Sequence, residues 1–489
     1  MSIGDAEKVA LSEQIDRISS LPDHLLAHIL SFLPTNDAVK TVLIRRFGNL
    51  WTAIDNLDFD VCLYHECSEV SYEDTVNEER LINLIRHLLI LHERSDIHRF
   101  RLKFEFNLWF TTDQLKLANE IDSWIHFALR KKVKVLGLDF KACGYAGQEG
   151  YHSFLDSIDG YYKLPNVVLT SDILTELKLV HCHVEPQEHI QLRSLKSLSL
   201  SCILISDETM IEIISGCPAL ESLFLYECYG FHKLNLTSLN LKNVVIKLNR
   251  HDSSRLKVSC PYLKSLNILG IERMDLNNLS SVVDAALDFS SSFNCARGEY
   301  HEVKKHFELL HDAEAVTLFT RSILVFTIWE LIISPCPSMN WRRLVLKTML
   351  TKWHLPGVAS LLRNSPHLEM LDIQLQPGTK PFCYRDDQWL MQYEIDGENF
   401  WDFQQWSFHC LRSHLKTIRI RSFEIKSCIV KLVHFLLRNA YVLEKLVIET
   451  NRVLYPEKAN LFMSEQWTEF SKELECVPRA SPQAVILFL

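Results

Sequence analysis

The sequence is poor in glycine and proline, with 14 and 15 of them among 489 residues. That scarcity excludes a collagen-like chain and a chain dominated by linkers. The sequence also has no excess of positive charge, because 52 Lys and Arg stand against 61 Asp and Glu, for a net charge of −9. Nothing in this balance draws the whole chain to nucleic acid or to anionic lipid. We therefore expect neither a nucleic acid nor a membrane as a partner.

Long apolar runs are also missing. The most apolar stretch, Ile323 to Ile333, is interrupted by Glu330 and is far shorter than the roughly 20 residues that span a bilayer. The N-terminal stretch MSIGDAEKVALSEQIDRISS carries acids and lacks the apolar core of a secretory signal. The 14 cysteines are scattered, so we expect reduced thiols. The expected location is the cytoplasm, the nucleus or both.

Motifs that carry chemistry are likewise scarce. Gly144, Gly147 and Gly150 have the wrong spacing for a nucleotide-binding loop, and His301 and His306 are too far apart to share one helical face as zinc ligands. The sequence His181-Cys182-His183 points alternate side chains in opposite directions if it forms a strand, and no further ligand pair accompanies it. We predict no catalytic residue, no cofactor and no metal site.

Leucine is the residue that the sequence has in excess. About 75 residues are Leu, roughly twice the share of an ordinary globular chain. Many of them belong to a hexad with apolar residues at its first, fourth and sixth positions. Clear hexads begin at Leu174, Leu195, Leu220, Leu236, Leu263, Trp341, Leu368, Leu415 and Leu443, and weaker ones at Ile97, Val133 and Ala313.

The spacing of these hexads predicts a leucine-rich-repeat solenoid. Successive clear hexads are commonly separated by 20 to 29 residues, the period of that architecture, in which each unit gives one strand and a helical or irregular return. A single repeat cannot bury its own leucines, so neighbouring repeats stack and share a core. Cys182 and Cys228 stand at the ninth position of their units, where this architecture accepts Cys to satisfy the turning backbone.

The segment from Asp16 to Trp51 differs in texture from the repeats. Ser19 or Ser20 is placed to cap a helix with Pro22 in its first turn, and the following leucines and isoleucines have the spacing of one helical face. Pro34 ends this helix and Thr35 begins another. So small a unit cannot bury all its large apolar groups, so part of its surface needs a partner.

These residues resemble a plant F-box, a helical motif that docks on the Skp adaptor of cullin–RING ubiquitin ligases. The similarity runs through Val39, and beyond it Phe47-Gly48 stands where the motif more commonly has Trp-Arg. The resemblance implies a three-helix domain whose adaptor-docking residues are Leu21, Pro22, Leu25, Leu26, Ile29, Leu30, Leu33, Pro34, Val39, Leu43 and Trp51.

The stretch from about 409 to 450 is similar to the FBD domain that follows the repeats in such proteins, and the whole chain resembles the plant F-box/FBD/LRR family. The predicted fold class is α/β: an F-box, then a solenoid with parallel strands on its concave face and helices and loops outside, ending in an FBD unit. The predicted divisions are a disordered N-terminus (1–15), the F-box (16–60), the repeats (61–375), an aromatic-rich insertion (376–408) and the FBD domain with terminal repeats (409–489).

Alternating residues of each hexad strand point to the concave surface. They are Ser197, Ser199 and Ser201; Ser222, Phe224 and Tyr226; Ser238, Asn240 and Lys242; Arg343, Val345 and Lys347; Thr417, Arg419 and Arg421; and Lys445, Val447 and Glu449. We hypothesise that a target is bound by an aromatic pair, Phe224 and Tyr226, and by a basic patch of Arg343, Lys347, Arg419 and Arg421. The alternative is that these are solvated strand residues without a role.

Three functions fit these features. The first is the target-recognition adaptor subunit of a Skp–cullin–F-box ligase, with a Skp adaptor, a cullin bound through it and an unknown target as partners. The second is a repeat protein whose altered F-box does not enter a ligase. The third is a receptor with a small-molecule pocket. The insertion either closes over the concave face as a lid or packs against the repeats.

Overall fold

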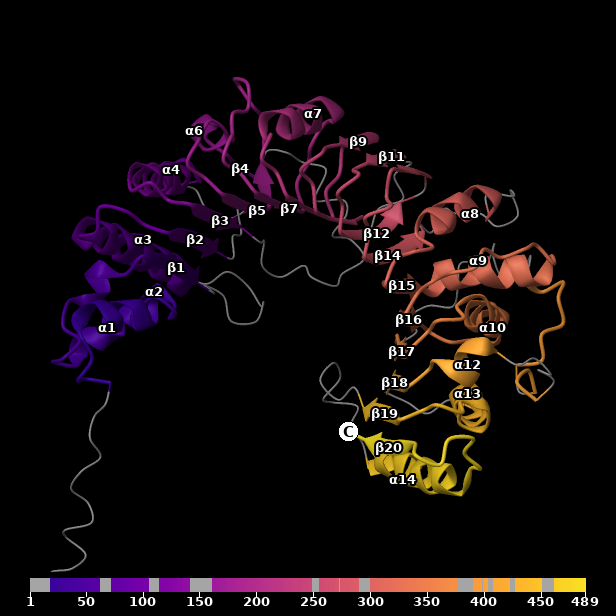
Figure 1. Cartoon of the computed structure of the whole chain (residues 1–489). Helices are drawn as coiled ribbons and strands as arrows, with labels where there is room; N and C mark the ends of the chain where they lie inside the picture. Colours follow the sequence, from indigo (N-terminus) through magenta and orange to yellow (C-terminus); the bar gives the residue numbers. More distant parts are fainter. Residues whose placement is uncertain are drawn as a thin grey trace, which may run out of the picture. The chain divides into compact units, whose positions relative to one another are not determined.

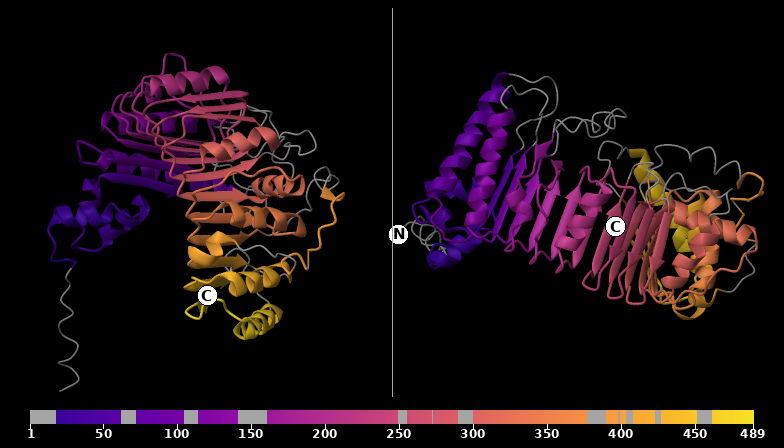
Figure 2. Two further views of the ribbon diagram at one scale, coloured as in Figure 1. Left: turned by 45° about the vertical axis from the view of Figure 1, so that its right-hand side comes forward. Right: turned by 90° about the horizontal axis from the view of Figure 1, so that it is seen from above.

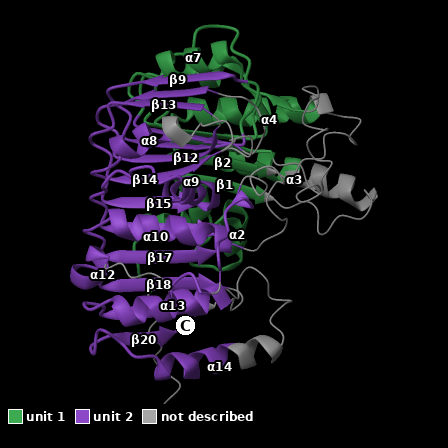
Figure 3. Ribbon diagram, turned by 90° about the vertical axis from the view of Figure 1, so that its right-hand side faces the viewer, with its two compact units in different colours: residues 1–220, 228–230 green, residues 221–227, 231–489 purple. Residues whose placement is uncertain are grey.

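The computed structural model describes residues 18–61, 72–104, 114–140, 161–248, 255–271, 273–289, 300–376, 390–397, 399–402, 408–422, 427–450 and 461–489. The predicted disorder of residues 1–15, the glycines of 144–150 and most of the 376–408 insertion lie outside this part. The chain divides into two compact units, residues 1–220 with 228–230 and residues 221–227 with 231–489 (Figure 3). The division falls within the predicted repeats, and the domain boundaries given above remain predictions.

The first unit begins with two short helices and two 3-10 helices: α1 (Asp23–Leu30), α2 (Thr35–Lys40), η1 (Thr41–Leu43) and η2 (Leu50–Ala53). Where the F-box resemblance implies a third α-helix, residues 44–49 form turns, with Gly48 at a φ of +40°. Ser19 and Ser20 do not cap α1. Its N-cap is Pro22, and no side chain caps it.

A parallel sheet follows in the first unit, in the order β1-β2-β3-β5-β7. Helices connect most of its strands and lie on one side of the sheet (Figure 1). These elements are β1 (Asn56–Val61), α3 (Tyr72–Leu91), β2 (Arg99–Phe104), α4 (Gln114–Arg130), β3 (Val135–Asp139), α6 (Asn166–Leu169), β5 (Glu176–Val180), β7 (Ser197–Ser201) and α7 (Asp207–Gly216), with a small pair β4 (Tyr162–Lys163) and β6 (Cys182–His183).

The second unit repeats the arrangement with a longer parallel sheet, in the order β8-β10-β12-β14-β15-β16-β17-β18-β19-β20. Its strands run side by side in both views of Figure 2. They are β8 (Ser222–Tyr226), β10 (Asn243–Lys247), β12 (Ser265–Ile271), β14 (Asp284–Phe289), β15 (Ala315–Phe319), β16 (Arg343–Thr348), β17 (Met370–Leu375), β18 (Thr417–Ser422), β19 (Lys445–Thr450) and β20 (Val485–Phe488).

Helices cover one face of this sheet (Figures 1 and 3). They are α8 (Tyr300–Leu309), α9 (Thr320–Leu331), η5 (Lys352–His354), α10 (Leu355–Asn364), α12 (His409–Ser413), α13 (Ser427–Asn439) and α14 (Leu461–Cys476). In the earlier repeats a second parallel sheet stands in their place, formed by β9 (Lys233–Thr237), β11 (Arg255–Ser259) and β13 (Arg273–Asn277). The predicted α/β repeat fold is confirmed.

The hexads account for the core because their apolar positions point to the covered face. In β8, Leu223 and Leu225 are fully buried while Ser222 and Phe224 are half-buried on the other face. The thiols of Cys182 and Cys228 are buried and donate to backbone carbonyl oxygens, of Val180 at 3.5 Å and of Leu200 at 3.3 Å. The cysteines thus satisfy the turning backbone, as predicted.

One hexad is misplaced by the sequence analysis. The match at Leu236 overlaps the end of β9, and the strand of the main sheet is β10, which follows a second match at Leu241. Ser238, Asn240 and Lys242 therefore lie between strands. The exposed face is instead supplied by Asn243, Val245 and Lys247. The β-branched run from Val244 to Ile246 suits a strand better than the Ser and Asn residues of the earlier match.

The described part of the aromatic insertion packs on the helices. The ring of Trp401 lies 4.7 Å from that of Phe435 on α13, and Phe408 meets the same ring at 5.7 Å, measured between centroids. Trp401 and Phe408 are both buried. These contacts agree with packing against the repeats, and they lie on the helical side of the sheet.

Candidate functional site

The N-terminal motif has a small core of its own. Leu26 and Leu30 of α1 are buried, as are Trp51 of η2 and Ile54 beyond it. Three of the predicted docking residues, Leu26, Leu30 and Trp51, thus lie in this core. Their side chains hold the motif together, so changing them would test folding as well as docking.

The remaining predicted docking residues lie at or near the surface. Leu25 and Ile29 stand one turn apart on α1 and are 41% and 42% exposed, and Leu43 on η1 is 87% exposed. Pro22, Leu33 and Pro34 are also exposed, and Leu21 and Val39 are half-buried. We call Leu25, Ile29, Leu33 and Leu43 the exposed set. Neighbouring Ile18, Phe32, Val42 and Ile44 are exposed too, and so many large apolar groups in one short segment mark an interaction surface.

Arg46 fixes the segment that precedes α1. Its Nε donates to the carbonyl oxygen of Ser19 at 2.8 Å, its Nη2 donates to that of Leu21 at 2.7 Å, and its Nη1 pairs with the Asp23 carboxylate at 2.7 Å. No local sequence pattern points to Arg46, because its contact with Ser19 spans 27 positions. Arg46 holds Leu21-Pro22-Asp23 in one conformation.

Two further hydrogen bonds tie the motif to the first strand. The backbone N–H of Asp58 in β1 donates to Oγ1 of Thr35 at 2.7 Å, and Asn56 Nδ2 donates to the carbonyl oxygen of Ser31 at 3.3 Å. Thr35 is fully buried. The motif is therefore part of the same compact unit as β1.

The predicted aromatic pair lies on the open face of the second unit's sheet, at β8. Tyr226 is 41% exposed, and Phe224 is half-buried. The Lys247 ammonium of β10 lies 4.6 Å from the centre of the Tyr226 ring and donates to its hydroxyl at 3.2 Å. The register pairs Phe224 with Val245 and Tyr226 with Lys247. The structure brings these two aromatics together on one strand.

The predicted basic residues lie farther along the same open face, on β16 and β18. In register, Arg343 pairs with Met370, and Met370 with Thr417; Lys347 pairs with Gln374, and Gln374 with Arg421. Arg343 is exposed, and Lys347, Arg419 and Arg421 are half-buried. Lys347 lies over the Phe319 ring, 5.3 Å from its centre. One strand, β17, separates the two pairs of basic residues.

Two acidic residues lie among these cations, and the predicted basic patch did not include them. Glu449 on β19 meets Arg419 Nε at 3.2 Å and Arg421 Nε at 2.9 Å. Asp372 on β17 is fully buried and meets Arg421 Nη2 at 3.4 Å. Arg421 is therefore held by carboxylates on both neighbouring strands, and Arg419 is held by Glu449.

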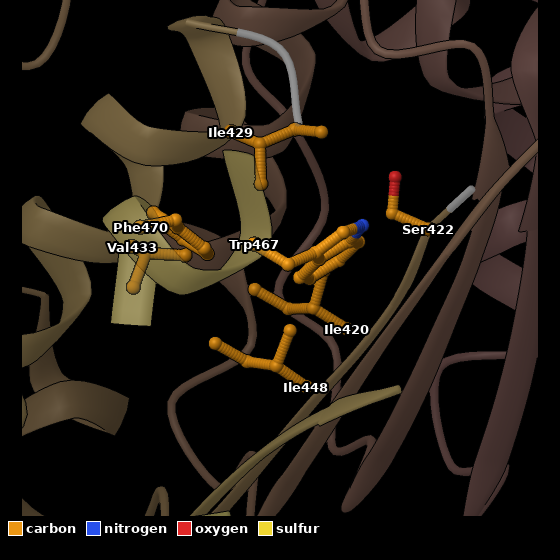
Figure 4. Close-up of a pocket in the computed structure, with 7 residues that line it drawn as sticks. All are labelled: Ile420, Ser422, Ile429, Val433, Ile448, Trp467 and Phe470. Atoms are coloured by element: carbon orange, nitrogen blue, oxygen red, sulfur yellow. The ribbon is translucent and has the colours of Figure 1, made fainter. Parts of the chain in front are cut away.

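A small apolar pocket lies on the helical side of the same strands (Figure 4). Its lining residues come from β18, β19, α13 and α14, and they are Ile420, Ser422, Ile429, Val433, Ile448, Trp467 and Phe470. The Ser422 hydroxyl and the Trp467 indole N–H are the only polar side-chain groups of this lining, and most of the other residues belong to the core. A receptor site needs several convergent polar groups to orient a ligand, so this pocket gives the small-molecule hypothesis little support.

Among the described residues, no three His, Cys, Asp or Glu side chains are placed to hold a metal ion together. None of the helices in that part of the chain has the length and the apolar character that crossing a membrane requires.

The fold and the N-terminal motif define a class: a leucine-rich-repeat protein that carries a short helical motif with exposed apolar residues. The family model described as "At1g61320/AtMIF1, LRR domain" matches residues 90–481. The chain thus belongs to this leucine-rich-repeat family of plant F-box proteins.

Several curated proteins of Arabidopsis thaliana are similar to the chain over most of their length. "Putative F-box/LRR-repeat protein At3g18150" is 28% identical over 456 residues, which cover 90% of this chain and 87% of that protein. "F-box/LRR-repeat protein At3g03360" is 26% identical and is 92% covered. "F-box/FBD/LRR-repeat protein At1g13570" is 25% identical over 491 residues and is covered completely. The predicted F-box/FBD/LRR family is confirmed.

Proposed function

We propose that this protein is the target-recognition adaptor subunit of a Skp–cullin–F-box ubiquitin ligase. Its N-terminal motif docks on a Skp-family adaptor through the exposed set, and the adaptor in turn binds a cullin. The open face of the repeats binds a target protein. In this role the chain supplies proximity and orientation, and the chemistry belongs to other subunits.

The observation that carries this proposal is the separation of apolar residues within the motif. Leu26 and Leu30 are buried, whereas Leu25 and Ile29, on the adjacent stripe of the same helix, are exposed. A helix that faced only its own unit would expose polar residues on that stripe. Large apolar residues at an exposed helical face are the residues that another protein covers.

Docking is tested by the double variant Leu25→Asp with Ile29→Asp. Binding of the purified full-length chain to a plant Skp adaptor is measured by isothermal titration calorimetry. We expect the variant to bind about 100-fold more weakly or not at all, because two charges replace buried contacts of the interface. Ile211→Asp is the matched control, since Ile211 is also an apolar helical residue with high exposure, 62%, but lies on α7.

The control should bind the adaptor as the wild type does, and both proteins should keep the wild-type urea midpoint, because all three residues are exposed. Equal binding by the double variant would refute docking through α1.

A specific observation favours a second function. Residues 44–49 form turns, and the third helix of the motif is reduced to 3-10 geometry. If the wild-type chain does not bind any Skp adaptor in the same calorimetric experiment, the protein is a repeat-based interaction protein that does not enter a ligase.

A further inference from the structure

Two rows of charge run across strands β16 to β19, and they differ in balance. At the entry to the strands, Arg342 pairs with Glu369 at 3.2 Å, and Lys416 pairs with Glu444 at 3.9 Å. Signs alternate from strand to strand in this edge row, so its charges cancel. The edge row has no charge left with which to attract a partner.

The charges on the open face of the same strands do not cancel. We call Arg343, Lys347, Arg419, Arg421 and Lys445 the cationic face, and the acids between them are Asp372 and Glu449. Five cations against two carboxylates leave an excess of three positive charges. Since the whole chain carries a net charge of −9, this excess is a local feature of the sheet.

The acids position the arginines without using up their donors. Each oxygen of Glu449 meets the Nε of one arginine, at 3.2 Å for Arg419 and 2.9 Å for Arg421. These two contacts leave the terminal amino groups of Arg419 available for the fork geometry that binds a carboxylate with two parallel hydrogen bonds. Because the side chains are already fixed, a ligand would lose less conformational entropy on binding them.

The two outer cations of the face are the most accessible. Arg343 and Lys445 are exposed, and within the described ranges neither makes an ion pair. They occupy the same row of the sheet, with Met370 and Thr417 between them. Three strand spacings separate them, or about 14 Å, the length of roughly four extended residues.

We propose that the cationic face binds an extended acidic segment of a protein partner, with carboxylates meeting Arg343, Lys445 and the fork of Arg419. The assignment rests on charge complementarity. In the edge row, acidic residues of the protein itself neutralise the cations, whereas on the cationic face the Asp or Glu residues of a partner would do so. This inference rests on the proposed function in one respect: the partner that carries the acidic segment is the target protein.

The same face is poorly suited to a nucleic acid. Single strands bind to aromatic platforms as well as to cations, and the ring of Phe319, beside this face, is covered by Lys347. Of the apolar residues on this face, Val345 and Val447 are buried and Met370 is half-buried.

The test measures the binding of fluorescein-labelled peptides to the full chain by fluorescence anisotropy at low salt. The probe is an acidic dodecapeptide, (Glu-Ala)6, and the reference is the neutral (Gln-Ala)6. We expect the wild type to bind the acidic peptide at least about tenfold more tightly than the neutral one, and to lose this preference as salt screens the charges.

The variant Arg343→Glu with Lys445→Glu should weaken binding of (Glu-Ala)6 by about tenfold or more. Its matched control is Arg342→Glu with Lys416→Glu, which changes the net charge equally and alters neighbouring positions in the sequence, but in the edge row. The control should bind nearly as the wild type does. All four residues are exposed, so both variants should fold, and their urea midpoints verify this.

Three results would overturn the inference: equal weakening by the two double variants, no preference for the acidic peptide, or tighter binding of a dT12 oligonucleotide that competes for Arg343 and Lys445. The Leu25→Asp with Ile29→Asp variant should bind (Glu-Ala)6 normally. Failure of adaptor docking and failure of peptide binding can therefore be told apart.

Discussion

Leucine has two different environments in the N-terminal motif and in the repeats. In β8 the hexad leucines Leu223 and Leu225 are fully buried, because each repeat is covered by its neighbours and by the elements behind the sheet. In the motif, Leu43 is 87% exposed and Leu25 is 41% exposed. A small unit has too little interior for its apolar residues. The same residue type thus stabilises the fold in one region and is available for binding in the other.

The largest expected effect is the difference in stability between two variants, one with a leucine truncated in the repeats and one with a leucine truncated in the motif. Leu223→Ala should lower the free energy of unfolding by about 2–5 kcal/mol, since it removes a fully buried side chain and leaves a cavity. Leu43→Ala should change it by no more than about 0.5 kcal/mol, because water already surrounds Leu43. Urea denaturation followed by circular dichroism measures both.

Leu43→Ala should instead weaken binding to the Skp adaptor. If Leu43→Ala destabilised the chain as much as Leu223→Ala, the contrast between the two regions would be wrong, and Leu43 would be covered by the chain itself.

A second difference between the regions is the burial of histidine side chains. His24 and His28 of the motif are exposed, whereas burial lowers the pKa of His306 and of His354 in the repeats to about 4. The Asp275 carboxylate opposes this shift at His306, and the nearby Lys305 adds to it. Both histidines are therefore neutral in the folded protein at neutral pH.

Acid should destabilise the repeats through these two residues. Between pH 6.5 and 4 the unfolded chain takes up protons that folded His306 and His354 do not, so stability falls as the pH falls through this range. Between pH 7 and pH 5 the two sites together should cost roughly 3–4 kcal/mol. Urea midpoints at pH 7 and pH 5 measure the loss, and the variant His306→Asn with His354→Asn should show a smaller difference. An unchanged difference would exclude these histidines as its cause.

The repeat fold was accessible from the sequence because its signal is periodic. Every hexad except the one at Leu236 coincides with a strand of the main sheets, including the weak matches at Ile97, Val133 and Ala313. One strand that was missed, β14, departs from leucine. Its Ala285 occupies the buried fourth position of the hexad, in register with Leu266 of β12, where the clear hexads have Leu or Ile.

The sites were less accessible because they depend on contacts between distant residues. The spacing of Leu25 and Leu26 predicts that both belong to one broad apolar face. Tertiary packing, in which η2 contacts α1, leaves Leu26 buried and Leu25 exposed. The sequence likewise shows the arginines at 419 and 421, but their pairing with Glu449 and Asp372 requires the strand register. Sequence patterns predicted the strand faces, and tertiary contacts determined how the charges on them combine.

The smallest expected effect concerns Arg46, which holds the segment that precedes α1. Arg46→Ala removes two hydrogen bonds to backbone carbonyls and one ion pair. Since the side chain is partly exposed, the loss of stability should be about 1 kcal/mol or less. Adaptor affinity should fall by roughly threefold to fivefold, because residues 19–23 would have to be ordered on binding.

Arg45→Ala is the matched control, since it removes the same charge from the neighbouring residue, whose side chain is exposed. Calorimetric titration of both variants with the Skp adaptor separates two explanations. If Arg46→Ala alone weakens binding, the conformation of Leu21-Pro22-Asp23 contributes to docking. If both variants weaken it equally, the adaptor responds to the positive charge of this segment, and Arg46 is not a positioning residue. The apolar surface of the motif would then bind its partner without a fixed conformation of residues 19–23. In this respect the motif would differ from the repeats, where Glu449 fixes Arg419 and Arg421 before any partner binds.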